Sequence, residues 1–261
     1  MTGWSGMIMN TVNVRNVEIG TGIPKICVPI VGTTRKDILA SAKEICSVGT
    51  DLVEWRADWY VDVLNFNEME KTAKELRSIL DEMPLLFTFR SKREGGNRDI
   101  DLDSYAGLNE FMMKTGDIDL IDVELFSGAS LVKKMISLAH SCGIKVIVSN
   151  HDFVKTPPEE ELLGRMQKMQ DLGADIPKIA VMPQSKRDVL TLLSATEKMA
   201  SIYADRPIIT MSMAGAGTIS RLCGEVFGSS VTFGSSGKAS APGQLPVDDL
   251  KTILSLLHKS L

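Results

Sequence analysis

The sequence is poor in the residues on which metal centres and disulfide frameworks depend. It has four cysteines and three histidines among 261 residues, and none of the cysteines form a Cys-x-x-Cys pair. This spacing excludes the usual zinc motifs and any obvious disulfide framework. It also fits a protein of a reducing compartment, so we expect a cytoplasmic location and no metal.

Two further absences narrow the class of protein. There is no excess of basic residues, since the net charge is −4 at pH 7, and this argues against a nucleic-acid binder. No apolar run reaches the roughly 18 residues of a transmembrane helix, so we expect no membrane span. Residues 1–10 lack the basic and apolar regions of a secretory signal, and we interpret them as a poorly ordered leader or added remnant.

What the sequence does contain is a regular alternation of short apolar runs and longer amphipathic stretches. Successive runs begin roughly 23 to 33 residues apart, about the length of one βα unit. The runs are Ile26–Val31, Leu52–Trp55, Leu85–Phe89, Ile118–Val123, Lys145–Ser149, Ile176–Val181, Pro207–Met211 and Ser230–Phe233. Helical patterns between them include Lys36–Val48, Glu68–Asp81, Ser130–Cys142 and Glu159–Leu172. Thr156, followed by two prolines, predicts a capped helix start, and Gly49 predicts a helix end.

Eight strands that alternate with helices over about 235 residues are typical of a (β/α)₈ barrel, the TIM barrel. An open doubly wound sheet is the alternative, but it normally has fewer strands and a Gly-rich first turn, which is missing here. Residues 11–20 alternate with period two around an Arg-Asn turn, and this predicts an N-terminal β-hairpin that closes one end of the barrel. We expect residues 11–261 to form a single domain, with the barrel over residues 25–261.

Lys178 stands in the middle of the apolar run Ile176–Val181. A lysine is rarely buried unless its charge is compensated, so an edge position with an exposed amine is the simpler interpretation. In a barrel, however, catalytic groups lie at the C-terminal ends of the strands. Polar residues occupy or follow most of the other predicted strands, and they include Glu54, Arg56, Arg90, Glu94, Asp122, Glu124, His151, Arg221, Ser240 and Gln244. Their convergence on one mouth favours an active site.

Each of these residues also has a simpler explanation. Glu54 and Arg56 are consistent with an exposed salt bridge, and Asp122 and Glu124 with solvated residues that face the helices. His151 is consistent with a structural histidine. The Gly/Ser-rich segment after the last strand is consistent with a flexible connection or a phosphate cradle. We favour the active site because all of these features fall at the same end of the barrel.

The chemistry of this set begins with a lysine that can form an imine. An amine is a nucleophile only when it is neutral, and ordinary lysines are almost all charged at pH 7. Apolar burial, together with like-charge repulsion from Arg56, Arg90 or Arg221, is expected to favour the neutral amine of Lys178. An imine with a ketone substrate then acidifies the neighbouring C–H bond, and His151 is the candidate base.

The remaining polar residues suggest what the substrate carries. Asp122, one strand earlier, is the candidate partner for the ring N–H of His151. The three arginines predict an anionic substrate, with a bidentate clamp on a carboxylate. The hydroxyl of Ser240 and the amide of Gln244 suit a polyol ring. These residues predict a Schiff-base lyase or aldolase acting on a hydroxylated keto acid; a silent barrel that binds a sugar acid as a sensor is the alternative outside enzymes.

Together these motifs resemble those of the type I 3-dehydroquinate dehydratase family. The matching segments are Val53–Asp58, Phe87–Ser91 with Glu94–Gly96, Ser149–Phe153, Pro177–Ala180, Met211–Met213 with Gly217 and Ser220-Arg221, and Ala239–Leu245. They run in order through the barrel, and the resemblance covers nearly the whole chain, from about residue 11 to the C-terminus. The resemblance implies dehydration of 3-dehydroquinate to 3-dehydroshikimate, in the shikimate route to chorismate and the aromatic amino acids. It also implies no metal or organic cofactor, and a homodimer.

The same resemblance implies a role for each matching residue. Lys178 forms the imine with the C3 ketone, and His151 removes the C2 proton and then helps the C1 hydroxyl to leave. Glu94 assists His151, and Arg221 holds the carboxylate. The ring hydroxyls are held by Glu54, Arg56, Arg90, Ser240 and Gln244. The loop after the last strand is expected to close over the substrate, with mobility from Gly234, Gly237 and Gly243. A class I aldolase of the same barrel type is the alternative.

Overall fold

The structure is a computed structural model that describes residues 10–237 and 241–261, so the leader up to residue 9 and Ser240 lie outside it. In the described residues a nine-stranded parallel sheet has the order β11-β10-β3-β4-β5-β6-β7-β8-β9. Its strands are β3 (Lys25–Ile30), β4 (Leu52–Arg56), β5 (Leu85–Thr88), β6 (Leu120–Glu124), β7 (Lys145–Asp152), β8 (Ile176–Val181), β9 (Ile209–Ser212), β10 (Val231–Ser235) and β11 (Leu245–Pro246).

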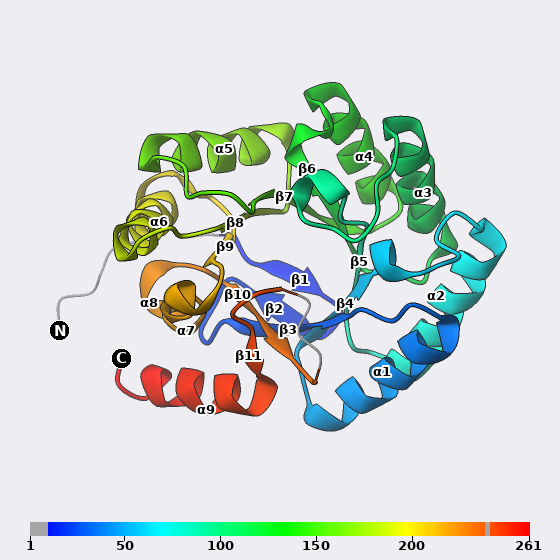
Figure 1. Cartoon of the computed structure of the whole chain (residues 1–261), viewed down its shortest axis with the longest axis horizontal. Helices are drawn as coiled ribbons and strands as arrows, with labels where there is room; N and C mark the ends of the chain where they lie inside the picture. The colour runs from blue at the N-terminus through cyan, green and yellow to red at the C-terminus, as the bar shows by residue number, and fades with distance from the viewer. Residues whose placement is uncertain (1–9, 238–240) are drawn as a thin grey trace.

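Helices surround this sheet on its outer side (Figure 1). They are α1 (Arg35–Val48), α2 (Phe66–Leu80), α3 (Leu102–Thr115), α4 (Ala129–Ser141), α5 (Glu159–Leu172), α6 (Lys186–Lys198), α7 (Ile219–Leu222), α8 (Gly224–Phe227) and α9 (Val247–His258). In the described part of the chain, no helix is both long enough and apolar enough to cross a membrane. The strand-helix alternation is that of a (β/α)₈ barrel, so the predicted TIM barrel is confirmed.

The barrel closes unevenly. β10 pairs with β3 over three residues, whereas β9 and β10 are joined in the described residues by one isolated bridge, between Ile208 and Ser229. The N–H of Ser230 donates to the carbonyl of Ile208 at 2.8 Å, and Ser229 Oγ accepts from the N–H of Thr210 at 3.0 Å. The short helix α7 contacts both strands beside this seam. The seam therefore leaves room at the mouth for a side chain from α7.

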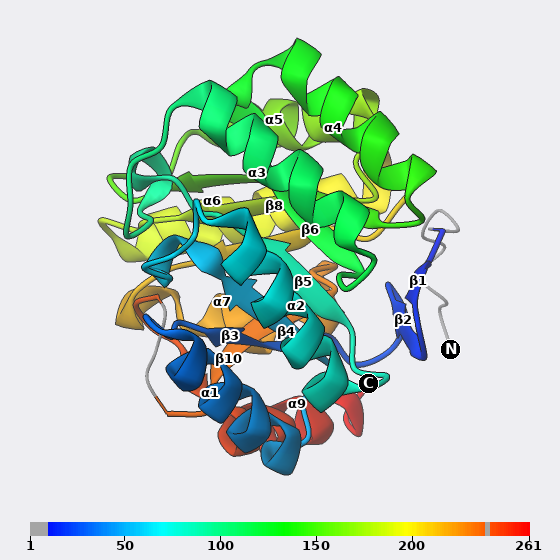
Figure 2. The same cartoon turned by 90° about the vertical axis from the view of Figure 1, so that its right-hand side faces the viewer.

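The predicted hairpin is present and lies at the end of the strands away from the βα loops (Figure 2). Its strands are β1 (Val12–Val14) and β2 (Val17–Ile19), joined by Arg15-Asn16, with Arg15 at a positive φ of 52°. Val12, Val14 and Ile19 are buried against apolar side chains from the starts of the barrel strands. The hairpin therefore plugs the N-terminal end of the barrel.

Inward-facing residues recur every two positions along each strand and form layers across the barrel. The layer beside the hairpin is apolar and contains Cys27, Leu52, Leu86, Leu120, Ile147, Ile176, Ile209 and Val231. Two residues further along, the next layer contains Glu54, Thr88, Asp122, Ser149, Lys178, Met211 and Phe233. Buried hydrogen bonds join neighbours in this second layer, from Thr88 Oγ1 to Glu54 Oε1 (2.9 Å) and from Ser149 Oγ to Asp122 Oδ1 (2.7 Å). Polarity therefore rises from the plugged end to the mouth.

Several predicted bounds are met and others are corrected. β8 and α5 begin and end where the sequence predicts. β7, however, runs on to Asp152, because its main chain stays paired with β8 as far as Val181. The predicted Thr156 cap is wrong: Pro158 is the N-cap of α5, and Thr156 Oγ1 instead donates to the carbonyl of Met182 at 3.1 Å.

Candidate active site

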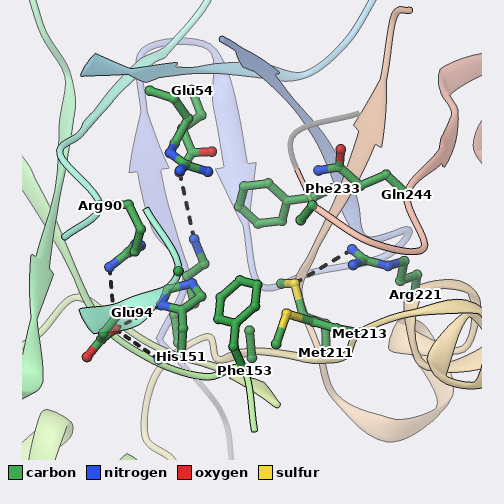
Figure 3. Close-up of a pocket in the computed structure, with 15 residues that line it drawn as sticks. Glu54, Arg90, Glu94, His151, Phe153, Met211, Met213, Arg221, Phe233 and Gln244 are labelled. Carbon is green, nitrogen blue, oxygen red and sulfur yellow. Dashed lines mark hydrogen bonds and ion pairs between the residues drawn. The ribbon is translucent and has the colours of Figure 1, made fainter. Parts of the chain in front are cut away.

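A pocket of about 480 Å³ opens at the C-terminal ends of the strands (Figure 3). Among the described residues, predicted site residues that line it are Glu54, Arg56, Arg90, Glu94, His151, Lys178, Arg221 and Gln244. Asp122 lies beneath the pocket, fully buried, whereas Ser240 is outside the described residues. The wall is completed by residues that the sequence did not single out for the site: Gly95, Phe153, Ala180, Met211, Met213, Phe233 and Ala241.

Lys178 lies inside the barrel and not at an edge, with 3% of its surface exposed. Its Nζ is 3.6 Å from Asp122 Oδ2 and 3.8 Å from Glu54 Oε1, and it sits 4.4 Å from the centre of the Phe233 ring. The predicted arginine neighbours are therefore replaced by carboxylates, because Lys178 shares a layer with Glu54 and Asp122. Arg56 and Arg90 lie one layer above, and Arg221 comes from α7. These contacts hold the amine at the floor of the pocket.

His151 pairs with Glu94, and the predicted pairing with Asp122 is wrong. Glu94 Oε2 lies 3.0 Å from His151 Nδ1 and accepts the backbone N–H of His151 at 2.9 Å. Asp122 lies in the layer of Ser149, whose Oγ donates to Asp122 Oδ1, and this layer is one inward step below the histidine. Its Oδ1 instead lies 2.8 Å from Arg90 Nη2. Asp122 therefore belongs to the floor of the site.

Glu94 reaches His151 because of a tight turn after β5. The 3₁₀ turn Lys92–Glu94 ends at Gly95, which has a φ of +80°. A Cβ on Gly95 would lie 2.2 Å from the Phe153 ring, and a Cβ on Gly96 would lie 1.8 Å from the Arg90 carbonyl oxygen. Only glycine is compatible with both close approaches. The Glu-Gly-Gly sequence is therefore the signal that places this carboxylate over the barrel.

The surroundings of the Glu94–His151 pair shift the pKa of both groups. Burial raises the pKa of Glu94 to about 7, although the positive charge of Arg90 acts in the opposite direction. Burial, followed by repulsion from Arg90 and Lys178, holds the pKa of His151 well below its usual value. His151 is therefore neutral near pH 7. When Glu94 is ionised it can only accept, so Nδ1 carries the proton and Nε2 is left unprotonated as a base.

Arg90 is the centre of a buried charge network. Its Nη1 donates to Glu124 Oε1 and to Ser149 Oγ, both at 3.0 Å, and its Nη2 makes the ion pair with Asp122. Burial disfavours its charge, but the surrounding carboxylates raise the pKa of Arg90 above its usual value. Glu124 is 1% exposed and also accepts from the Ser91 N–H and hydroxyl, so its interpretation as a solvated residue is wrong.

Arg56 is held by a residue that the sequence analysis did not select. Its Nε and Nη2 donate to the two carboxylate oxygens of Asp58, at 2.8 and 2.9 Å. Asp58 is fully buried and also accepts the N–H of Asn97, at the far end of the Glu94 turn, at 2.9 Å. Glu54 and Arg56 therefore do not form a rim salt bridge. The spacing Arg56-x-Asp58 was the available signal, because a bidentate pair of this kind orients a guanidinium.

Arg221 comes from α7, on the seam side of the pocket, and its surroundings differ from those of Arg90. Its Nη2 donates to the carbonyl of Pro242 at 3.2 Å, and its Nη1 lies 3.6 Å from the sulfur of Met211. Its Nε is buried without a hydrogen-bond partner, and no acidic side chain pairs with it in the part of the chain that the structure describes. Burial lowers the pKa of Arg221 to about 10. The site therefore presents a buried cation that suits an anionic ligand.

The segment after β10 returns to this side of the pocket. Its end forms β11, which pairs with Gly234 and Ser235, and Pro242 contacts Arg221. Gly243 has a φ of +79°, and a Cβ there would lie 2.5 Å from the Ala214 carbonyl oxygen. A Cβ on Gly234 would lie 2.9 Å from a methyl group of Leu250. In this conformation these two glycines are required for close packing, and the mobility predicted for the segment stays a prediction.

Comparisons with known proteins agree with this geometry. A family model described as type I 3-dehydroquinase matches residues 26–261. The 3-dehydroquinate dehydratase of Clostridioides difficile (strain 630) is 54% identical over 250 residues, which cover 96% of this chain and 98% of the relative. That of Bacillus subtilis (strain 168) is 51% identical over 252 residues, which cover 97% and 99%.

Solved structures give the same result. A crystal structure of the type I 3-dehydroquinate dehydratase from Clostridium difficile, with covalent modified comenic acid, superposes with a TM-score of 0.95 at 54% identity and covers 97% of this chain and 100% of that one. The 3-dehydroquinate dehydratase from Geobacillus kaustophilus has a TM-score of 0.94 at 42% identity, with coverage of 97% and 98%. The resemblance seen in the motifs is thereby confirmed: this chain belongs to the type I 3-dehydroquinase family.

Proposed function

We propose that this chain dehydrates 3-dehydroquinate to 3-dehydroshikimate through an imine on Lys178. The observation that carries the proposal is the division of the pocket: a buried lysine at the floor, a Glu94–His151 pair on one side, and on the other an arginine that has no counterion among the described residues. A substrate held by its carboxylate at Arg221 extends across the pocket toward the amine and the histidine. Family membership supports the same reaction.

The proposed sequence starts with Lys178 Nζ attacking the C3 ketone; loss of water gives an imine, and its nitrogen takes up one proton from solvent to become an iminium. The iminium withdraws electrons from C2, so His151 Nε2 can remove the C2 proton and give an enamine. The enamine expels the C1 hydroxyl, which takes a proton from His151 and leaves as water. Hydrolysis then consumes one water, releases the enone and the proton taken up from solvent, and regenerates Lys178. One water is lost overall, and His151 ends in the protonation state in which it began.

The other residues hold the substrate and the catalytic groups. Arg221 binds the carboxylate, while Glu54, Arg56 and Gln244, with Ser240, bind the ring hydroxyls. Arg90 acts mainly by positioning, since its donors are already engaged by Asp122, Glu124 and Ser149. We propose that no metal or organic cofactor takes part, and that the segment after β10 closes over the substrate.

The same family resemblance supports three further proposals, which concern the whole protein. We propose that residues 11–261 form a single domain, that the protein is a homodimer, and that it works in the cytoplasm within the shikimate route. Light scattering during gel filtration tests the homodimer, which should appear at twice the mass of the chain. A mass equal to one chain at micromolar concentration would contradict it.

Turnover of 3-dehydroquinate, followed through the ultraviolet absorbance of the conjugated enone, tests the proposed function. Lys178→Ala should abolish turnover, because no other residue that lines the pocket in the described part of the chain offers an amine to form the imine. His151→Ala should lose about 10²- to 10⁴-fold in kcat, the usual contribution of a general base. Lys145→Ala is the matched control, since Lys145 lies at the plugged end of β7 and pairs with Asp175. Wild-type protein that forms a substrate adduct without enone would indicate the aldolase alternative.

A further inference from the structure

Asn150 lies next to His151 at the end of β7 and is 2% exposed. Its Nδ2 is 3.2 Å from Glu94 Oε1, and its Oδ1 is 2.6 Å from Arg165 Nη1. Arg165 belongs to α5, outside the barrel. A continuous chain of hydrogen bonds therefore runs from an outer helix, through Asn150 and Glu94, to the imidazole of His151.

The direction of this chain follows from the donors available. A guanidinium has only donors, so Arg165 must face the carbonyl oxygen of the Asn150 amide. The NH₂ of Asn150 then points at Glu94 Oε1 and donates to it, which favours the ionised form of that carboxyl. With Oε1 occupied in this way, Oε2 remains for the backbone N–H and Nδ1 of His151. The orientation of Asn150 is thus set by Arg165 and decides how Glu94 presents its charge.

Arg165 is itself held in place by two further contacts. Its Nη2 donates to the carboxylate of Glu161, one turn earlier on α5, and its guanidinium carbon lies 5.4 Å from the centre of the Phe126 ring. The side chain of Arg165 is 15% exposed. A charged group fixed on an aromatic face and by an ion pair supplies a directed donor at little entropic cost.

Asn150 and Arg165 reach the Glu94–His151 pair from outside the catalytic pocket. In the described residues neither lines the catalytic pocket, whose wall includes Glu94 and His151 (Figure 3). Both line a second, more open cavity of about 710 Å³ that also reaches Glu94 and His151. Any effect of these two residues on the reaction must therefore pass through the Glu94–His151 pair.

We propose that Arg165 is a positioning residue for the base: through Asn150 it keeps Glu94 ionised and aligned, so that His151 Nε2 stays unprotonated and directed at the substrate. The proposal rests on the proposed function, since it assigns a partner to the same base. Nothing in it requires Arg165 to contact the substrate. Replacement of Arg165 should therefore change kcat and its pH dependence and leave KM nearly unchanged.

The test is the pH profile of kcat and kcat/KM for 3-dehydroquinate in Arg165→Met. We expect kcat at pH 7 to fall about tenfold with KM changed less than about twofold, and the acid limb of the profile to move up by about one pH unit. Asn150→Ala should give the same shift, because it removes the residue that links Arg165 to Glu94. Arg165→Lys should restore part of kcat, because an ammonium still donates to Asn150 Oδ1.

Two further variants keep the result interpretable. Lys198→Met removes an ion pair with Glu159, also on α5 but away from His151, and should leave the profile unchanged. Glu161→Gln loosens Arg165 at an exposed position and should give a smaller shift of the same sign, even where Arg165→Met fails to fold. A variant that loses thermal stability but keeps the wild-type profile would reduce Arg165 to a structural role and overturn the proposal. Failure of the proposed function would instead appear as absent turnover in the wild type.

Discussion

Arg90 and Arg221 are both almost fully buried, yet they stand in opposite electrostatic environments. Arg90, on the β4–β7 side of the pocket, pairs with Asp122 at 2.8 Å and Glu124 at 3.0 Å, and its pKa is raised. Arg221, beside the seam between β9 and β10, has no carboxylate partner among the described residues, and burial lowers its pKa to about 10.

The charge of Arg90 is neutralised by carboxylates of the protein itself. Among the described residues nothing neutralises the charge of Arg221, so that role falls to a ligand. Burying an unpaired charge costs several kcal/mol, whereas a paired and hydrogen-bonded charge is tolerated. On the β4–β7 side the protein supplies its own counterions and is preorganised before substrate arrives. On the seam side the substrate carboxylate supplies the missing charge, so binding at that point is directional. The two arginines should therefore respond differently to the same substitution.

The largest effect is expected on stability, from Arg90→Met. This change leaves Asp122 and Glu124 buried without their counterion, so the free energy of unfolding should fall by about 3–5 kcal/mol. Urea unfolding followed by fluorescence or circular dichroism measures it. Arg35→Met is the matched control, because its two ion pairs, with Glu68 and Glu75 at 3.5 Å, are exposed and should contribute less than about 1 kcal/mol. Equal losses of unfolding free energy in Arg90→Met and Arg35→Met would contradict the special role of the buried charge network around Arg90.

Arg221→Met should give the opposite pattern. Its unfolding free energy should not fall, because a buried cation without a counterion has been removed. The KM for 3-dehydroquinate should rise at least about 100-fold, since charge-assisted hydrogen bonds to a carboxylate are lost. Steady-state kinetics and urea unfolding of the same preparation measure both quantities. A large loss of stability with an unchanged KM would mean that Arg221 stabilises the fold and does not bind the substrate.

The smallest effect concerns the protonation of Glu94, on the β4–β7 side of the pocket. Because burial raises the pKa of Glu94 to about 7, protonation of Glu94 below that pH removes the acceptor that fixes the His151 tautomer. The value of kcat/KM should therefore fall about tenfold per pH unit below pH 7. Since the pKa of His151 is held well below its usual value, the histidine itself should not produce this limb. Glu94→Gln should be less active and should lose the inflection near pH 7; an inflection that persists would have to come from another group.

The barrel is largely predictable from the sequence because its signals are local. Short continuous apolar runs and the glycines that end helices identify the strands and helices, and β8 and α5 are placed with their observed bounds. The end of β7 is missed because hydrophobicity stops at Ser149, while main-chain pairing with β8 continues through Asn150 and His151. Hydrophobicity reports what a side chain faces, and pairing does not depend on it.

The contents of the site are also predictable, but its internal pairings are not. The polar residues in and after the strands identify Lys178, His151 and the arginines as residues of one pocket. Which carboxylate meets His151 depends on the layer that each strand register assigns and on the tight turn that carries Glu94. The apolar wall residues Met211 and Phe233 were within reach of prediction, since each lies two residues beyond an inward apolar position of its strand.

The most direct test of the account is borohydride trapping with 3-dehydroquinate, followed by peptide mapping by mass spectrometry. The imine mechanism predicts a reduced adduct on Lys178 in the wild-type protein. In His151→Ala the same adduct should accumulate while enone formation is nearly lost, because the imine forms before the base is needed. Trapping on a different lysine, or continued turnover with no adduct on any lysine, would contradict the central claim.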